Sequence, residues 1–417
     1  MLKNEKNRIQ KIIQNAEAST KTEFETELIK ATDQFVVYRP AFELHTLIAG
    51  YPWFLDWGRD SLLSLEGLLL KTKRYDIAKE VLLTMAKNIK CGLVPNGYSE
   101  KDNKPLYNSV DASLLLFEQI QKYLNYTGDY EFVKEHIYDK LKEIIENYKN
   151  GIDLDDNNIK LDKDFLISSG TANTQNTWMD AKTYGIAATP RNGKVVEINS
   201  LWYNGLMIMA DLAEKFEEQP NTKKYKELAR KCKKSFNAKF YNSKRKCLYD
   251  VITDEKNKDG KIRPNQLFAL SLTHPIVEPN SIEANNIINV VEKKLLNNYG
   301  LKTLAKGEPN YVDIYEGDAF KRDMSYHQGI TWTWLLELYY EALKNMVKFE
   351  KRKTYKTKLE TKLKDFVEKE KQVFEKEINQ RGCVGSIAEI YDSTKPYEPK
   401  GAIAQAWSVG AICTMIL

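Results

Sequence analysis

Apolar residues recur along this chain at the spacing of helix faces, whereas the alternation typical of strands is nearly absent. The pattern predicts helices near residues 4–16, 22–35, 60–71, 75–89, 111–125, 130–149, 198–216, 222–239, 264–273, 281–297, 328–346, 352–379 and 401–416. Short segments such as KCLYDVIT are compatible with a β-hairpin. Because no linker rich in Pro, Gly or Ser divides the chain, we expect one domain over residues 1–417, with an accessory helix within residues 1–20.

The predicted helices are of two kinds that alternate along the chain. One kind is apolar nearly all round, as in SLLSLEGLLL and GITWTWLLELYY, which predicts burial among other helices. The other kind is amphipathic and rich in Lys and Glu, as in KKYKELARKCKKSF. About six such alternations predict an all-α fold, an (α/α)6 barrel (toroid) of six inner and six outer helices. A helical solenoid is the rival interpretation, but its repeats should resemble one another and these do not.

Polar and aromatic residues precede every predicted inner helix. The segments are WFLDWGRD, LYNSVD, TPRNGKVVE, IRPNQ, KRDMSYHQG and AEIYDSTKPYEPKG. In a toroid the N-terminal ends of the inner helices converge on one mouth, so we expect these side chains to line one pocket. The partial positive charge of helix N-termini favours ionised carboxylates there.

Composition narrows the class of protein. Hydrophobic residues make up 42% of the 417 residues, enough for a large core. The net charge is +5, and the basic runs have the spacing of solvated helix surfaces, so no nucleic-acid partner is expected. No segment reaches the roughly 18 apolar residues of a membrane span, and the first residues lack the apolar core of a secretory signal. Five scattered cysteines indicate free thiols in a reducing compartment, so a cytoplasmic protein is expected.

The residue types gathered before the inner helices suit a sugar. Aromatic faces stack on the CH face of a sugar ring, while carboxylate, amide and guanidinium groups make paired hydrogen bonds with its hydroxyls. The four histidines lack ligand spacing, so no metal site is predicted. No GxSxG, Walker or GxGxxG motif occurs, so no cofactor is predicted and carboxylates remain for catalysis. A pair of carboxyl groups is the basis of glycoside hydrolysis.

Two carboxylates stand out by their sequence context. Asp180 ends QNTWMD in a long loop region before the third inner helix, and Glu389 lies in GSIAEIYD directly before the sixth. Apolar neighbours raise the pKa of a carboxyl and keep it protonated as an acid, whereas a carboxylate that faces donors and water stays ionised as a base. On composition alone, either residue could instead be a helix cap or part of a loop ion pair.

Eight motifs, many of them long, occur in a single order: IAGYPWFLDWGRD, YNSVDASL, TWMDAK, ATPRNGKVVEINSLWYNGL, RPNQLFALSL, RDMSYHQGITWTW, AEIYD and GAIAQAWSV. Together they resemble the C-terminal glucosidase domain of glycogen debranching enzymes, the amylo-α-1,6-glucosidase family, from about residue 35 to the C-terminus. The resemblance implies a glucoamylase-like (α/α)6 barrel and an inverting hydrolase that removes α-1,6-linked glucose from debranched glycogen or limit dextrin, releasing free glucose. It also implies that Asp180 is the general acid, that Glu389 is the general base, and that Trp57, Arg59 and Asp60 bind the terminal glucose.

Further residues of these motifs are expected around the two carboxyl groups: Trp178, Lys182, Arg191, Glu197, Trp202, Asn204, Asn265, Gln266, His327, Gln328 and Gln405. A structural alternative stays open for several of them. Trp202, Trp332 and Trp334 could pack in the core, and Arg191 could simply pair with Glu197. Equally, His327 could be a core histidine whose ring nitrogens are hydrogen-bonded within the fold. Asp111 could be a helix N-cap. Arg322 and Asp323 could form an ion pair.

The chain departs from the family pattern at two positions and in extent. Leu115 stands where the family has Trp in DASLWF, which would remove an aromatic platform, and Thr333 stands where it has Pro. No transferase barrel accompanies the glucosidase region. We therefore expect either a stand-alone glucosidase or one that has a separate glucanotransferase polypeptide as its partner. The branched α-glucan substrate is the other expected partner.

Two alternative functions remain. One is a glucoamylase- or trehalase-like α-glucosidase of the same fold, because linkage is set by subsites beyond the terminal glucose. The other is a non-catalytic glycan-binding barrel. Retention of both Asp180 and Glu389 argues against the second alternative, since binding alone needs neither an acid nor a base.

Overall fold

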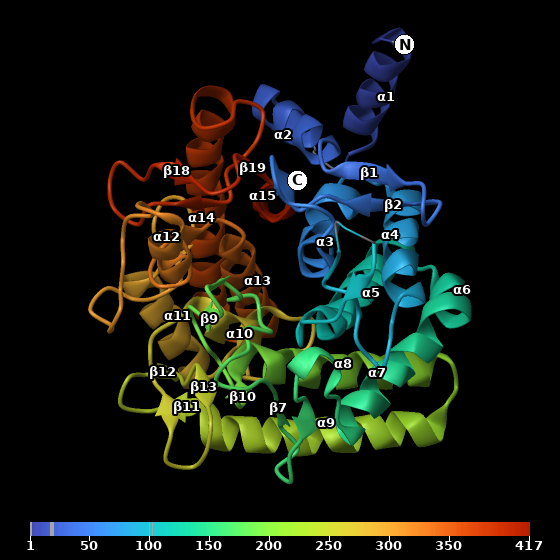
Figure 1. Cartoon of the computed structure of the whole chain (residues 1–417), viewed down its shortest axis with the longest axis vertical. Coiled ribbons are helices and arrows are strands. Elements are labelled where there is room, and N and C mark those ends of the chain that lie inside the picture. The colour runs from blue at the N-terminus through green and yellow to red at the C-terminus, as the bar shows by residue number, and fades with distance from the viewer. Residues whose placement is uncertain (1, 17–20, 100, 102) are drawn as a thin grey trace.

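The computed structural model describes residues 2–16, 21–99, 101 and 103–417. The chain is mostly helical, and the apolar helices lie close to the predicted positions (Figure 1). They are α3 (Gly58–Leu65) continued by the π-helical η1 (Glu66–Leu70), α5 (Ala112–Thr127), α8 (Val196–Lys215), the 3-10 turn η4 (Pro264–Leu267) with α10 (Phe268–Ser271), α13 (Leu335–Phe349) and α15 (Ala406–Ile416).

These apolar helices contact one another in a closed cycle. α3 contacts α5, α5 contacts α8, α8 contacts α10, α10 contacts α13, α13 contacts α15, and α15 contacts α3 again. Side chains on all sides of these helices are buried; in α8, for example, Ile198, Leu201 and Trp202 are all inaccessible to solvent. The cycle explains why the segments are apolar nearly all round: each helix has neighbours on several faces.

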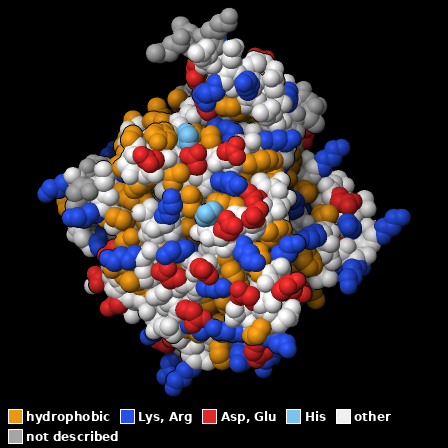
Figure 2. Space-filling view, turned by 90° about the vertical axis from the view of Figure 1, so that its right-hand side faces the viewer, with side chains coloured by type: hydrophobic (Ala, Val, Ile, Leu, Met, Phe, Trp, Pro, Cys, Tyr) orange, Lys and Arg blue, Asp and Glu red, His pale blue; other side chains and the backbone are white. Residues whose placement is uncertain are grey.

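The amphipathic helices pack on the outside of this cycle. They are α2 (Glu23–Asp33), α4 (Tyr75–Lys87), α7 (Tyr138–Asn150), α9 (Gln219–Phe240), α11 (Ile282–Lys294) and α14 (Lys353–Gln380). In α9 the buried residues Tyr225, Ala229, Cys232, Phe236 and Phe240 form one stripe along the helix, and this helix lies against α8. The Lys and Glu side chains between them remain at the surface, where basic and acidic groups are interspersed (Figure 2).

The remaining helices of the described residues are α1 (Leu2–Asn15), α6 (Tyr130–Phe132) with the π-helical η2 (Val133–Ile137), the 3-10 turn η3 (Leu154–Asp156) and α12 (Ala319–Ser325). The expected accessory helix corresponds to α1, which contacts α2 at the edge of the molecule (Figure 1); residues 1 and 17–20 of the expected segment lie outside the described residues. Within the described ranges, no helix combines the length and the hydropathy that a membrane span requires.

Small antiparallel sheets occur where the sequence predicts almost none. The longest pair joins β1 (Val36–Arg39) to β2 (Leu44–Leu47). The other strands are two residues long: β3 (Gly50–Tyr51), β4 (Gly97–Tyr98), β5 (Pro105–Leu106), β6 (Lys160–Leu161), β7 (Ile167–Ser168), β8 (Lys182–Thr183), β9 (Ile186–Ala187), β10 (Lys194–Val195), β11 (Tyr241–Asn242), β12 (Cys247–Leu248), β13 (Val251–Ile252), β14 (Lys258–Asp259), β15 (Leu301–Lys302), β16 (Thr331–Trp332), β17 (Ile390–Tyr391), β18 (Pro399–Lys400) and β19 (Ala404–Gln405). Such strands are too short to show an alternating pattern.

The segment KCLYDVIT is only partly the hairpin suggested by the sequence. Its first half, β12, forms a hairpin with β11, but its second half, β13, pairs instead with β10 and β14 in a three-stranded sheet. The expectation of one local hairpin was therefore incomplete, because β13 takes a partner from a distant part of the chain.

Three strand pairings also correct the predicted starts of the last two apolar helices. The fifth begins at Leu335 rather than at residue 328, because β16 pairs with β15 and β17. The sixth begins at Ala406 rather than at residue 401, because β19 pairs with β3. These pairings hold the loops in front of α13 and α15 against each other and against the loop in front of α3.

Candidate active site

A cleft of about 880 Å³ lies where the loops in front of α3, α8, α13 and α15 meet. Its lining residues are Trp53, Phe54, Ala181, Lys182, Tyr315, Glu316, Gly317, Ala319, Arg322, Asp323, Tyr326, Glu389, Lys400 and Gly401. Loops far apart in sequence thus contribute polar and aromatic groups to one cavity. The segments WFLDWGRD, KRDMSYHQG and AEIYDSTKPYEPKG line it, whereas LYNSVD, TPRNGKVVE and IRPNQ do not, so the prediction that all six segments line one pocket is confirmed only in part.

Glu389 is held at the wall of this cleft by two donors. Its Oε2 accepts the backbone N–H of Ala402 at 2.9 Å, and its Oε1 accepts the hydroxyl of Tyr326. Gly401 has a φ of +69°, and a Cβ there would overlap Oε2, so glycine leaves room for the carboxyl. Glu389 is only 2% exposed. Burial, with a smaller contribution from the charge of Asp180, raises its pKa to about 7 against the opposing effect of the two hydrogen bonds.

Asp180 lies in the loop in front of α8, next to Ala181 of the cleft wall. Its Oδ2 accepts Nη1 of Arg59 at 2.7 Å, and 35% of its side chain is exposed. Desolvation raises the pKa of Asp180, and Arg59 opposes that effect. Because Asp180 also raises the pKa of Glu389, the two carboxyl groups lie within electrostatic range of each other.

Arg59 is the centre of a buried ion cluster beneath Asp180. Its Nε lies 2.9 Å from both carboxylate oxygens of Asp111, while its Nη2 is buried without a hydrogen-bond partner among the described residues. Asp111 stands at the N-cap position of α5 but does not cap the helix; Ser109 Oγ accepts the N–H of Ala112 and donates to Asp111. Asp111 therefore occupies the expected N-cap position, but its side chain pairs with Arg59 instead of capping the helix.

Asp60 and Trp57 complete the start of α3. Asp60 Oδ1 accepts Nε2 of Gln405 at 3.3 Å, a contact that follows from the pairing of β19 with β3. Burial raises the pKa of Asp60 well above its ordinary value; Arg59 opposes this shift, and Asp180 and Glu389 add to it. The half-buried Trp57 ring packs against Gly97, where a Cβ would lie 3.2 Å from it.

We predict that Tyr326→Phe shifts the pH-rate profile of any reaction in which Glu389 serves as a base. The Tyr326 hydroxyl donates to Glu389 and thereby lowers the pKa of that carboxyl, so removing the hydroxyl raises this pKa. The ring remains to pack on Trp332. If Glu389 acts as a base, the acid limb of the kcat/KM profile moves to higher pH, measured by initial rates between pH 4 and 9. An unmoved limb, or one displaced to lower pH, would contradict this role of Tyr326.

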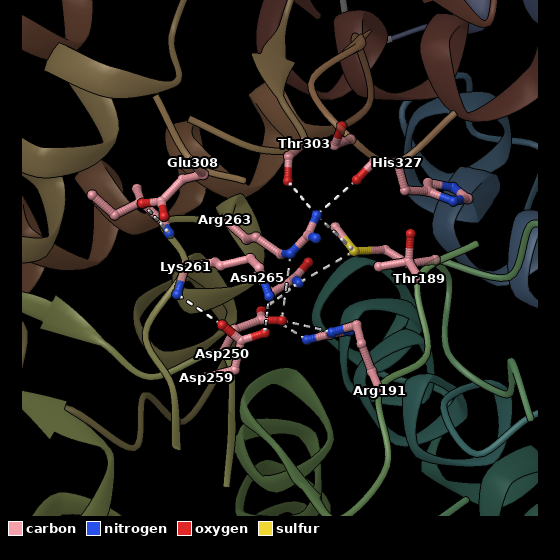
Figure 3. Close-up of polar contacts among 12 residues, drawn as sticks. Thr189, Arg191, Asp250, Asp259, Lys261, Arg263, Asn265, Thr303, Glu308 and His327 are labelled. Carbon is pink, nitrogen blue, oxygen red and sulfur yellow. Dashed lines mark hydrogen bonds and ion pairs between the residues drawn. The ribbon is translucent and has the colours of Figure 1, made fainter. Parts of the chain in front are cut away.

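Several predicted site residues form a buried polar network behind the cleft (Figure 3). Arg191 pairs with both Glu197 and Asp250, and Asp250 Oδ1 also accepts Nδ2 of Asn265 at 2.8 Å. Asn265 in turn accepts the indole N–H of Trp178 at 2.8 Å. The pairing of Arg191 with Glu197 confirms the structural alternative for those two residues. Asp250 was not predicted as a site residue, because it lies outside the eight motifs shared with the family.

Arg263 extends the same network toward the loop in front of α13 (Figure 3). Its Nη1 donates to the backbone oxygens of His327 and Thr303 at 2.7 and 3.0 Å, and its Nη2 donates to Gln328 Oε1 at 2.9 Å. Gln328 donates in turn to Thr189 Oγ1 at 2.9 Å. Gln328 therefore ties two loops together.

The indole rings of this region form a cluster. Trp178 meets His327, Trp332 and Trp334 edge-on, with centroids 5.0–5.5 Å apart. His327 is fully buried, and neither ring nitrogen has a hydrogen-bond partner among the described residues, so it is not the satisfied core histidine of the alternative interpretation. Burial and the nearby charge of Arg263 lower the pKa of His327 well below its ordinary value, which keeps the ring neutral.

Other predicted site residues lie apart from the cleft lining. Trp202 is buried and stacks on Tyr148, Asn204 donates to Glu118 Oε2 at 2.8 Å, and Gln266 donates to the backbone of Arg263. Lys182, by contrast, is exposed and lines the cleft.

The two departures from the family pattern also lie away from the cleft lining. Leu115 is buried in the core, beside a smaller cavity that it shares with Phe268 and Trp334. Thr333 donates its hydroxyl to the backbone oxygen of Tyr299 at 2.8 Å.

Some cleft residues were not singled out from the sequence. Tyr326, Tyr315 and Trp53 line the cavity, and each lies in or near a segment that precedes an apolar helix. Arg322 and Asp323 also line it; no ion pair joins these two in the described part of the chain, so that alternative is not supported. The signal that could have found Tyr326, Tyr315 and Trp53 is their position in or near the loops that precede the apolar helices.

The network around Arg191 is expected to be structural. Arg191→Met leaves the buried carboxylates of Glu197 and Asp250 without their shared cation, which should lower the free energy of unfolding by about 3–5 kcal/mol. Urea unfolding followed by circular dichroism measures this loss. The matched control is Arg230→Met, whose ion pair with Glu227 on α9 is exposed and should leave stability nearly unchanged. Equal stability of the two variants would contradict the structural role.

Two carboxyl groups of raised pKa, one in the lining of a cleft and one directly beside it in sequence, are compatible with glycoside hydrolysis. Comparison with known proteins identifies the family. The family model described as Amylo-alpha-1,6-glucosidase matches residues 30–414. The glycogen debranching enzyme of Saccharomyces cerevisiae is 26% identical over 392 residues, which cover 73% of this chain and 25% of the yeast protein. The chain belongs to the amylo-alpha-1,6-glucosidase family of glycoside hydrolases, and it spans about a quarter of the length of this curated relative.

Proposed function

We propose that this protein is an inverting α-glucosidase that removes α-1,6-linked glucose from a debranched α-glucan such as glycogen limit dextrin and releases free glucose. Family membership and the resemblance of the yeast debranching enzyme support the substrate class. We further propose that the cycle of apolar helices is the inner ring of an (α/α)6 barrel, that the amphipathic helices form its outer ring, and that the chain acts as one catalytic unit.

The observation that carries this proposal is that Glu389 lines the cleft while Asp180 directly precedes Ala181 of the same lining, and that the charge of Asp180 raises the pKa of Glu389 although no hydrogen bond joins the two in the described structure. An inverting glycosidase needs a water molecule between its base and the sugar, so the carboxyl groups are held roughly 6.5–9.5 Å apart rather than in contact. In the proposed mechanism, Asp180 protonates the glycosidic oxygen while Glu389 activates water on the opposite face of the ring.

The two carboxyl groups suit different roles. Arg59 donates to Oδ2 of Asp180, and no other side chain of the described residues donates to this carboxyl, so Oδ1 is proposed to carry the proton. A bound sugar would cover the exposed part of this side chain and raise its pKa further. Glu389 instead accepts two hydrogen bonds, which favour its ionised form as a base.

The start of α3 is proposed to bind the terminal glucose. Arg59 has a buried Nη2 without a partner, and Gln405, which donates to Asp60, has a buried Oε1 without one in the described residues. Buried polar atoms of this kind favour a ligand that supplies hydrogen-bonding partners. Trp57 lies beside them at the N-cap of α3 and would provide an aromatic face.

A panel of substrates with proton NMR of the products tests the proposal. Glucose should be released from a limit dextrin with single α-1,6-glucosyl stubs, and β-glucose should appear first because inversion places water opposite the leaving group. Faster release from maltose or trehalose would instead favour a glucoamylase- or trehalase-like enzyme. First appearance of α-glucose would refute the inverting mechanism, and binding of the glucan without turnover would indicate a glycan-binding barrel.

A further inference from the structure

A second cavity of about 560 Å³, here called the polar pocket, shares Lys182 with the cleft. The segment 171–182, which carries Asp180, contributes residues to both cavities: Asn173, Gln175 and Asn176 line the polar pocket, whereas Ala181 lines the cleft. The polar pocket is therefore adjacent to the acid side of the cleft.

The lining of the polar pocket indicates the chemistry of its ligand. Every described residue that lines it has a polar side chain, and three of them are the carboxylates Asp153, Asp155 and Asp156. Lys182 is the one cation among these lining residues, so an anionic ligand such as a phosphate would meet net repulsion. Carboxylate and amide groups without an apolar wall suit a neutral ligand with many hydroxyls, which both donate and accept.

The walls of the polar pocket are joined to each other by hydrogen bonds. Asp155 accepts the N–H of Tyr107 at 2.9 Å, and Asn157 accepts the N–H of Gly170 at 2.7 Å and Nδ2 of Asn176 at 3.2 Å. These bonds connect the loops around residues 155 and 173 to the segment in front of α5. The cavity thus has a fixed shape before any ligand enters, which lowers the entropic cost of binding.

Other lining side chains take no part in holding the fold. Within the described residues, the side chains of Asp153, Asp156, Asn173 and Gln175 make no hydrogen bond or ion pair with the rest of the chain. Asn108, which also lines the cavity, has a buried Oδ1 without a partner in the same described part. The pocket therefore presents several unused donors and acceptors on a preformed wall.

We propose that the polar pocket binds the glucan chain on the leaving-group side of the scissile bond. The inference rests on the proposed function. A general acid must face the glycosidic oxygen, so the chain attached to that oxygen leaves the cleft on the side of Asp180. The segment 171–182 runs from there along the polar pocket, and Lys182 lines both cavities.

The test compares two substrates in the double variant Asp156→Ala/Gln175→Ala. α-Glucosyl fluoride has no sugar on its leaving side, whereas a maltotetraose with one α-1,6-glucosyl stub has four. The ratio of kcat/KM for the branched substrate to kcat/KM for the fluoride should fall roughly 10-fold, through a higher KM, because two hydrogen-bonding side chains are lost. The matched control Asp365→Ala/Gln380→Ala, on exposed positions of α14, should keep the wild-type ratio.

Each outcome decides between explanations. An unchanged ratio in the pocket variant would overturn the inference, and so would an equal loss on both substrates, since the variant would then act by displacing Asp180. If the wild-type protein hydrolyses neither substrate, the proposed function fails, and calorimetric titration with unbranched maltotetraose still tests the pocket. Weaker binding by the pocket variant than by the control supports the inference, and equal binding overturns it.

Discussion

Asp180→Asn should lower kcat on a branched α-1,6 substrate by roughly 10²–10⁴-fold, the usual contribution of a general acid. Asparagine has nearly the same shape and still offers Arg59 an oxygen in place of Oδ2, so the ion cluster of Arg59 with Asp111 should persist. It cannot donate a carboxyl proton to the glycosidic oxygen. The loss should therefore appear in kcat rather than in KM, measured by the rate of glucose release.

The leaving group separates acid catalysis from a general loss of activity in this variant. Fluoride departs without protonation, so hydrolysis of α-glucosyl fluoride by Asp180→Asn should fall far less than hydrolysis of the branched substrate. Asp365→Asn, at an exposed position of α14, is the matched control and should behave as wild type on both. Full activity of Asp180→Asn on the branched substrate would end the assignment of the acid.

The helical part of this fold could be predicted because the buried faces of a helix are occupied by apolar residues in the sequence. α8 is apolar on all sides, and α9 carries one stripe that includes Tyr225 and Phe236; the two patterns distinguish a helix with neighbours all around from one with a single covered face. The short strands have no such recognisable hydrophobic pattern. β19 has only two residues, yet its pairing with β3 delays the start of α15 and positions Gln405 at Asp60.

The candidate site was predictable only to the level of loops. Polar residues from three of the six segments in front of the apolar helices converge on the cleft, but the sequence does not show which segments or side chains face it. Arg191 and Asn265 point instead into a buried network around Asp250, a residue outside the quoted motifs. The role of Tyr326 could not be predicted from its loop sequence. Its contact with Glu389 depends on the pairing of β16 with β17, which joins two segments far apart in the chain.

Glu389→Gln should lower kcat by roughly 10²–10⁴-fold on the branched substrate and on α-glucosyl fluoride alike. Both reactions need an activated water molecule whatever the leaving group, and glutamine cannot accept its proton. The single amide oxygen of glutamine can still accept the N–H of Ala402, and its NH2 group can donate to the oxygen of Tyr326, so the wall of the cleft should keep its shape. Glu360→Gln, on the exposed face of α14, is the matched control. Hydrolysis of the fluoride at the wild-type rate by Glu389→Gln would contradict the base assignment.

The pH profile of the wild-type protein bears on the same residue. A base must be ionised, and burial raises the pKa of Glu389 to about 7, so kcat/KM should rise as the pH increases through about 7. An ordinary glutamate would place this rise near pH 4.3. Hydrolysis of α-glucosyl fluoride needs no general acid, so the acid limb of its kcat/KM profile reports the ionisation of Glu389 alone. Because the pKa of Glu389 is raised, this limb should lie near neutral pH. An acid limb near pH 4 with the fluoride would mean that some other carboxylate activates the water.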